Sequence, residues 1–234
     1  MKLIIFDLDQ TLVDFLSVHD EVTRRVFKEF FNVDARLTEI DFTGKSLTEN
    51  FTELARLKDI PEDVLQKKSS QLLESYETTF GESLAQDTAK YVLPGVRELL
   101  DELSKTDHIV VLYTGSSSRI VDHVFRVTGL GRYFKFCFYG TEVETRSDMV
   151  RLAISEAEKS TGWQFRHKNI VIIGDSVRDI ECGKLFSALT VAVATGFHSK
   201  GELLKAGPDY LFDNLKDYRE VLKAIGCRSS VAVD

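Results

Sequence analysis

Cysteine is scarce in this sequence, and no two cysteines have the spacing of a zinc or redox motif. The three thiols, Cys137, Cys182 and Cys227, lie far apart along the chain. An odd number of widely spaced cysteines does not indicate a disulfide framework. We therefore expect reduced thiols in a reducing compartment.

Positive charge is also in deficit. The 234 residues include 30 Lys and Arg against 37 Asp and Glu, which gives a net charge of -7 at pH 7. Nucleic acids and anionic membranes are bound through clustered basic side chains. We therefore expect neither of them as the main partner.

Long apolar runs are missing as well. Runs such as residues 109–113 and 170–173 have the length of a strand and are too short to span a bilayer. The apolar stretch after Lys2 is interrupted by Asp7 and Asp9, so it does not resemble a signal peptide. These features predict a cytoplasmic protein.

Short apolar runs rich in β-branched and aromatic residues recur along the chain and predict strands. They are residues 2–8, 109–113, 136–139, 170–173, 189–194 and 210–212. Helical spacing fills the intervals, as in Val96, Leu99, Leu100 and Leu103. This alternation predicts an α/β fold with a Rossmann-like, doubly wound parallel sheet whose ligands bind at the carboxyl ends of the strands.

One segment breaks the alternation. Residues 15–80 contain no convincing strand but three successive helical patterns, the third with Pro61 near its start. We predict an inserted helical cap domain at 15–85 and an α/β core at 1–14 and 86–234. Hinges are expected near Asp14 and at 80–90.

Acidic and hydroxyl-bearing loops directly follow three of the predicted strands. They are Asp7-Leu8-Asp9-Gln10-Thr11, Thr114-Gly115-Ser116-Ser117-Ser118 and Gly174-Asp175-Ser176-Val177-Arg178-Asp179. The carboxylates suit a nucleophile, an acid/base and a hard divalent cation, and the second loop suits an anion. Taken singly, each loop could be an Asx turn or a helix cap.

These three motifs, in this order and separation, resemble the haloacid dehalogenase superfamily, specifically its phosphoglycolate-phosphatase-like branch. The resemblance covers nearly the whole chain. It implies a magnesium-dependent phosphatase that hydrolyses a small phosphorylated metabolite through an aspartyl-phosphate intermediate. The oligomeric state is not implied.

The resemblance also implies a role for each matching position. Asp7 is the nucleophile and Asp9 the general acid/base, while Thr114 and the amides of Gly115 and Ser116 hold the phosphoryl group. Mg²⁺ is bound by the Asp7 carboxylate, the Asp9 backbone carbonyl and Asp175. Asp179 lies at the metal or orients its water ligands.

Two positions depart from the family pattern. Gln10 stands where many relatives have Gly, and we expect altered access or cap contact there. The family's third motif is a lysine that stabilises the negative charge on the nucleophile and the phosphate. The matching segment here, Glu144-Thr145-Arg146-Ser147-Asp148, contains no lysine. Arg146 is our candidate for that positive charge, as a catalytic and phosphate-binding residue, in preference to the alternative of an exposed residue before a helix. Lys168 is a rival on the side away from the site.

The predicted cap contributes the turn Thr43-Gly44-Lys45-Ser46, which resembles the substrate-specificity loop of capped relatives. Lys45 is therefore a candidate substrate-binding residue, and an ordinary N-capping turn is the alternative. His19, Arg24 and Arg25 lie on a helix of mixed charge, and we expect them to be solvated.

Two other functions remain open at this stage. A phosphosugar mutase of the same superfamily shares both aspartates, and it would need a cap that keeps water from the aspartyl phosphate. From a different class, a non-enzymatic signalling or binding module could accept a phosphoryl group on Asp7 as a switch. Such modules are usually shorter and have no cap.

Overall fold

A six-stranded parallel sheet forms the centre of the molecule in this computed structural model, which describes residues 1–84 and 89–227. The strand order is β3-β2-β1-β4-β5-β6, so the chain winds outward in both directions from β1. The strands are β1 (Leu3–Phe6), β2 (Ile109–Thr114), β3 (Phe136–Tyr139), β4 (Ile170–Gly174), β5 (Leu189–Val193) and β6 (Tyr210–Phe212). All six predicted strands are present, with small shifts at their ends.

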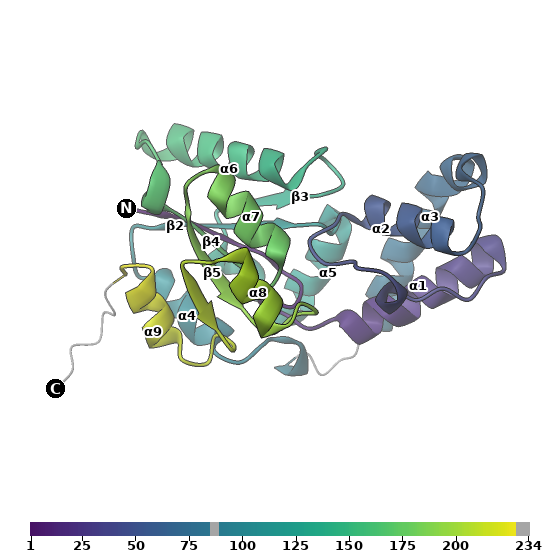
Figure 1. Cartoon of the computed structure of the whole chain (residues 1–234), viewed down its shortest axis with the longest axis horizontal. Helices are drawn as coiled ribbons and strands as arrows, with labels where there is room; N and C mark the ends of the chain where they lie inside the picture. Colours follow the sequence, from purple (N-terminus) through teal and green to yellow (C-terminus); the bar gives the residue numbers. More distant parts are fainter. Residues whose placement is uncertain (85–88, 228–234) are drawn as a thin grey trace.

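Helices cover both faces of the sheet (Figure 1). One face packs on α4 (Val96–Leu103), α5 (Ser118–Thr128) and α9 (Tyr218–Ala224); the other packs on α6 (Arg146–Thr161), α7 (Val177–Leu185) and α8 (Lys200–Ala206). Alternate residues of β1 serve the two faces, because Ile4 and Phe6 belong to one apolar cluster and Leu3 and Ile5 to the other. Short 3-10 helices occur at Leu37–Glu39, Ala89–Tyr91, Leu130–Tyr133 and His167–Asn169. The doubly wound α/β prediction is confirmed.

The first three α-helices after β1 form a helical unit, residues 16–83, at one end of the molecule (Figure 1). They are α1 (Leu16–Phe31), α2 (Leu47–Leu57) and α3 (Glu62–Ser83). Their buried apolar side chains continue without a break into the cluster beneath α4 and α5. The predicted domain boundary at 85–86 lies outside the described residues.

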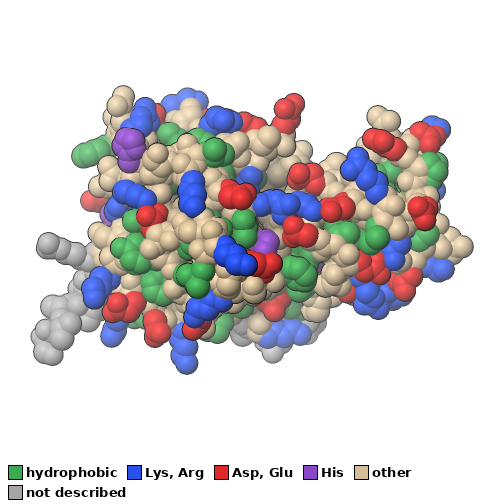
Figure 2. All heavy atoms as spheres, in the orientation of Figure 1, with side chains coloured by type: hydrophobic (Ala, Val, Ile, Leu, Met, Phe, Trp, Pro, Cys, Tyr) green, Lys and Arg blue, Asp and Glu red, His purple; other side chains and the backbone are tan. Residues whose placement is uncertain are grey.

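The described helices include none that is both long and apolar enough to cross a membrane. On the face shown in Figure 2, Lys and Arg side chains are interspersed with Asp and Glu.

The register of the central strands brings the three motif loops together. Phe6 of β1 lies opposite Leu112 of β2 and Ile173 of β4, so the three strands end at nearly the same level. The Asp7 amide donates to the Ile173 carbonyl at 2.9 Å, which extends the ladder up to the motif. Parallel strands that end level place the loops after them at one edge of the sheet, and the helical unit stands over that edge.

Candidate active site

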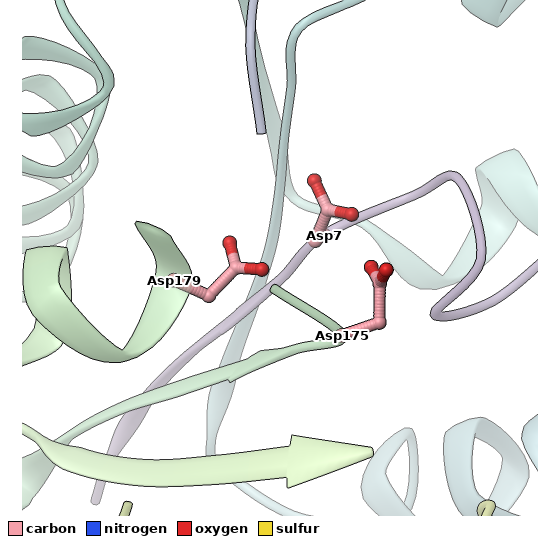
Figure 3. Close-up of side chains that lie close together, drawn as sticks. All are labelled: Asp7, Asp175 and Asp179. Atoms are coloured by element: carbon pink, nitrogen blue, oxygen red, sulfur yellow. The ribbon is translucent and has the colours of Figure 1, made fainter. Parts of the chain in front are cut away.

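Three buried carboxylates meet at the carboxyl edge of the sheet (Figure 3). Asp7 follows β1, Asp175 follows β4, and Asp179 lies in the first turn of α7. One oxygen from each lies within 4.8 Å of the others, and the three groups are turned toward the same space. Buried acids at this spacing repel one another unless cations lie among them, and carboxylate oxygens are the ligands that Mg²⁺ prefers.

The three carboxylates differ in how many protein donors they already accept from. Asp179 accepts at both oxygens: Tyr113 Oη and Arg146 donate to Oδ1, and the Ser176 amide and hydroxyl donate to Oδ2. Asp175 accepts from the Thr11 hydroxyl at 3.0 Å through Oδ1. Asp7 and Asp175 therefore have more free ligand capacity, and the bonds of Asp179 suit a residue that orients its neighbours.

Gly174 is required for this arrangement. A Cβ added to Gly174 would lie 2.2 Å from the carboxyl carbon of Asp179, closer than any real contact. The absence of a side chain at the end of β4 thus lets Asp179 fold back toward Asp7.

Arg146, at the first position of α6, enters the carboxylate cluster from the side. Its Nη2 donates to Asp7 Oδ1 and to Asp179 Oδ1, both at 2.5 Å, and its guanidinium lies 4.1 Å from the centre of the Tyr113 ring. The side chain is 10% exposed, so the alternative of an exposed residue before the helix is wrong. Lys168 does not compete for this place, since its ammonium pairs with Asp209.

Burial and charge set the protonation of the cluster. Burial raises the pKa of Asp7 to about 7, against the opposing attraction of Arg146. Burial and the neighbouring Asp7 and Asp179 carboxylates raise the pKa of Asp175 well above its ordinary value. For Asp179, burial is outweighed by Arg146 and by the bonds from Ser176 and Tyr113, so its pKa is lowered. The cluster has too little positive charge to ionise fully without a cation, which fits a metal site.

Asp9 lies nearer the solvent, with 31% of its side chain exposed. Ser116 Oγ donates to its Oδ2 at 3.1 Å, and His19 Nε2 lies 3.4 Å from its Oδ1. The other ring nitrogen of His19 is 2.7 Å from the Tyr76 hydroxyl. A chain of polar groups therefore joins Asp9 to α1 and α3 of the helical unit.

The expectation that His19 is solvated is wrong, because only 5% of it is exposed. His19 belongs to the buried stripe of α1, together with Val22, Thr23, Val26 and Phe27. The spacing of that stripe was visible in the sequence. A histidine at its amino-terminal end, beside the acidic motif, was the signal that could have found this contact.

Thr114 and the loop that follows β2 line the floor of the site beside Asp9. Thr114 is 1% exposed, and its hydroxyl accepts from the Ser116 amide at 3.1 Å. Ser117 is the residue that caps α5, since its hydroxyl accepts from the Ile120 amide. Ser116 is left to face Asp9.

The turn of residues 43–46 packs against the loop that follows β2. Ser46 and Glu49 form a capping box at the start of α2. The Leu47 amide donates to the Gly115 carbonyl at 3.1 Å, and a Cβ on Gly115 would lie 2.0 Å from the Lys45 carbonyl oxygen. The capping alternative is therefore correct for Ser46, while Lys45 lines the cavity beneath.

A cavity of about 70 Å³, partly open to solvent, lies between the two parts of the chain. Its floor contains the sequence-predicted residues Asp7, Asp9, Thr114, Gly115, Ser116, Arg146 and Asp175, and its roof contains Lys45. Asp179 stands behind Arg146 and does not line it. The structure thus brings every candidate residue to one place, although their roles stay predictions.

Gln10 also lines the cavity and adopts a left-handed backbone conformation, with φ of 62°. Its side-chain amide donates to Asp14 Oδ1 at 2.7 Å, and its carbonyl accepts from the Thr195 hydroxyl. The side chain therefore ties the acidic loop to the residue two positions before α1, and the expected change in access or cap contact at Gln10 stays a prediction.

Comparisons with known proteins agree with this geometry. Phosphoglycolate phosphatase of Synechococcus elongatus is 26% identical over 217 residues, covering 93% of this chain and 95% of that protein. The solved structure of a predicted phosphoglycolate phosphatase from Haemophilus somnus superposes with a TM-score of 0.76 at 19% identity and covers 94% and 97% of the two chains. β-Phosphoglucomutase from Clostridium difficile gives 0.75 at 16% identity, covering 97% of each, which shows the shared fold alone.

A family model described as haloacid dehalogenase-like hydrolase matches residues 4–193, a span that contains all three motif loops, the helical unit and Arg146. The chain belongs to the haloacid dehalogenase-like hydrolase family, and within it is a phosphatase-type hydrolase related to the phosphoglycolate phosphatases.

Proposed function

We propose that this protein is a magnesium-dependent phosphatase that hydrolyses small phosphomonoesters through an aspartyl-phosphate intermediate on Asp7. The observation that carries the proposal is the cluster of Asp7, Asp175 and Arg146 on the floor of one cavity. A phosphomonoester dianion and an attacking carboxylate repel each other, so the reaction needs positive charge between them.

Mg²⁺ would be held by the carboxylates of Asp7 and Asp175 and by the backbone carbonyl of Asp9. When bound, the metal would neutralise charge on the phosphoryl oxygens and align them with Asp7. Asp7 and Asp175 keep oxygen lone pairs that no protein donor uses, and these suit Mg²⁺. The surplus of negative charge at the cluster also fits this ion. Asp179 would hold Arg146 and Tyr113 in place, since both donate to it.

Asp7 would attack phosphorus in line with the leaving oxygen, and the Thr114 hydroxyl with the amides of Gly115 and Ser116 would hold the phosphoryl oxygens. Arg146 would share its guanidinium between nucleophile and phosphoryl group. Asp9 would protonate the leaving alkoxide and later remove a proton from the attacking water. Its exposure and its contacts with Ser116 and His19 support a group that changes protonation during the cycle.

Steady-state hydrolysis tests the proposal directly. The substrates are p-nitrophenyl phosphate and a panel of small phosphomonoesters that includes phosphoglycolate, with Mg²⁺ and with chelator. We expect turnover only with Mg²⁺ and a loss on the order of 10³-fold or more in Asp7→Asn. Asp122→Asn, an exposed site on α5, is the matched control and should keep wild-type rates.

The assay also separates the alternatives. A phosphosugar mutase, the second candidate because the fold is shared with β-phosphoglucomutase, would release little inorganic phosphate but would interconvert sugar phosphates. A phospho-accepting module would take up one equivalent of phosphoryl group on Asp7 and stop. Either result with folded wild type would refute the phosphatase assignment.

A further inference from the structure

The roof of the cavity carries both apolar and polar side chains. The apolar ones are those of Leu16, Leu37, Phe42 and Leu47. The polar side chains of α2 and its preceding turn that line the cavity are Thr43, Lys45 and Asn50, and the Thr43 hydroxyl donates to Asp41 Oδ1 at 2.6 Å. Because the proposed reaction holds the phosphoryl group on the floor, Lys45 and Asn50 would face the part of the substrate that leaves.

Lys45 is not a free cation. Its ammonium pairs with the carboxylate of Glu53, which lies within α2. Only 13% of the lysine side chain is exposed. The other cationic side chain that lines the cavity, Arg146, is paired with Asp7 and Asp179. Among the described residues, each cation at the cavity therefore already has a carboxylate partner.

Asn50 also lines the cavity, through a side chain that is almost wholly buried. The residue is 5% exposed, and its side-chain oxygen is not accessible from the cavity. Its amide group can donate to a hydroxyl or to a carboxylate, so Asn50 does not distinguish the two. Any discrimination between them therefore depends on the charge at Lys45.

We propose that Glu53 sets the specificity of this cavity for a small, neutral, hydroxylated leaving group, such as that of a short polyol phosphate, over a leaving group that carries a carboxylate. The inference rests on the proposed phosphatase function. A hydroxyl can accept from a remaining ammonium hydrogen of Lys45 while the ion pair with Glu53 stays intact. A carboxylate on the leaving group would have to compete with Glu53 for Lys45, and the negative charge of Glu53 would repel it.

The cavity has room for a short leaving group. A single water needs roughly 10–15 Å³ of such space, and the cavity offers about 70 Å³ and is partly open to solvent. Glycerol 3-phosphate and phosphoglycolate are both small enough to compare, and they differ chiefly in hydroxyl against carboxylate.

The test measures kcat/KM for these two esters, with p-nitrophenyl phosphate as a generic reference, in wild type, Glu53→Gln, Lys45→Gln and Glu74→Gln. Wild type should prefer glycerol 3-phosphate. Glu53→Gln frees the lysine, and we expect the ratio of the two kcat/KM values to move about tenfold toward phosphoglycolate. Lys45→Gln leaves Glu53 unpaired and should move the ratio the other way. Glu74→Gln makes the same charge change on the exposed side of α3 and should leave it unchanged.

The outcomes distinguish this inference from the activity on which it rests. Absence of turnover on every ester, including the generic one, would remove the proposed function itself. Magnesium-dependent turnover with the same discrimination in wild type and Glu53→Gln would overturn the role of Glu53 alone. A wild type that prefers phosphoglycolate would likewise overturn it. Circular dichroism of each variant confirms that the chain is folded.

Discussion

At the scale of single residues, Arg146 places a planar guanidinium among the buried carboxylates, where we propose that it replaces a lysine ammonium. One guanidinium reaches both Asp7 and Asp179 while its face rests on the Tyr113 ring. The fork can bond two carboxylates at once, and a lysine ammonium on a shorter reach can do so only as a point charge. The departure from the family pattern thus keeps the charge and changes its geometry.

This geometry predicts a graded response to substitution. Arg146→Ala leaves two buried carboxylates without their cation, and we expect kcat to fall on the order of 10²–10³-fold. Arg146→Lys keeps the charge and should retain more activity, with a loss of about tenfold. Steady-state kcat with saturating Mg²⁺ measures both. Arg151→Lys, an exposed residue on the same helix, is the control; equal losses in the Ala and Lys variants would contradict the role of the charge.

At the scale of elements, the turn that precedes α2 is held shut by the α/β body. Arg178, at the start of α7, donates to the Thr43 carbonyl and lies 3.3 Å from the Asp41 carboxylate. The rings of Phe42 and Phe197 lie 5.6 Å apart. Arg178 lies between Asp175 and Asp179 in the sequence. The segment that carries these two acids therefore also contacts the roof of the cavity.

Removal of that contact should loosen the roof. We expect Arg178→Gln to speed hydrogen exchange in residues 41–47 and to raise KM for small esters by about threefold to tenfold, since a roof that opens more often holds its ligand less well. Mass spectrometry of hydrogen exchange reads the first effect without any turnover. Arg24→Gln, within α1, serves as the control. Unchanged exchange in the 41–47 peptide would show that Arg178 does not hold the turn.

The elements were also the level at which the sequence was most informative. The buried strands are visible as short continuous apolar runs, and the three motif loops follow directly after such runs. Both are local patterns, so the strands and the edge of the sheet that carries the site could be predicted from them. The pairing of Arg146 with Asp179 joins residues far apart in the chain, and no local pattern specifies it. The pairing of His19 with Asp9 is shorter in range, and only the place of His19 in the buried stripe of α1 points to it. The Glu53 partner of Lys45 was missed for a related reason: an eight-residue separation across a turn and a helix start is not a helical spacing.

At the scale of the whole molecule, the fold gathers negative charge at one edge of the sheet, and this should appear in its pH dependence. Burial raises the pKa of Asp7 from 3.8 to about 7 in the metal-free protein. Between these values the folded protein holds a proton that the unfolded chain has released. The free energy of unfolding therefore falls as pH rises, with an upper limit of about 1.4 kcal/mol per pH unit for this group.

Urea denaturation in chelator at pH 5 and pH 8 measures the effect. The stability of wild type relative to Asp7→Asn should decline between the two, since the amide does not titrate. Added Mg²⁺ at pH 8 should recover stability in wild type more than in the variant, because a ligand of the folded state stabilises it. Parallel pH curves for wild type and Asp7→Asn would rule out Asp7 as the titrating group.

The contact between Gly115 and the carbonyl of Lys45 has a consequence for how such a protein can diversify. At this point the turn and the α/β body meet through main-chain atoms, with the Leu47 amide bonded to the Gly115 carbonyl. This part of the closure therefore does not depend on the side chains of Lys45 and Asn50. Those two residues can be exchanged to admit a different substrate without rebuilding this contact, whereas any side chain at position 115 would push the two chain segments apart. Substrate range and closure are thus separable properties, open to independent evolution or redesign.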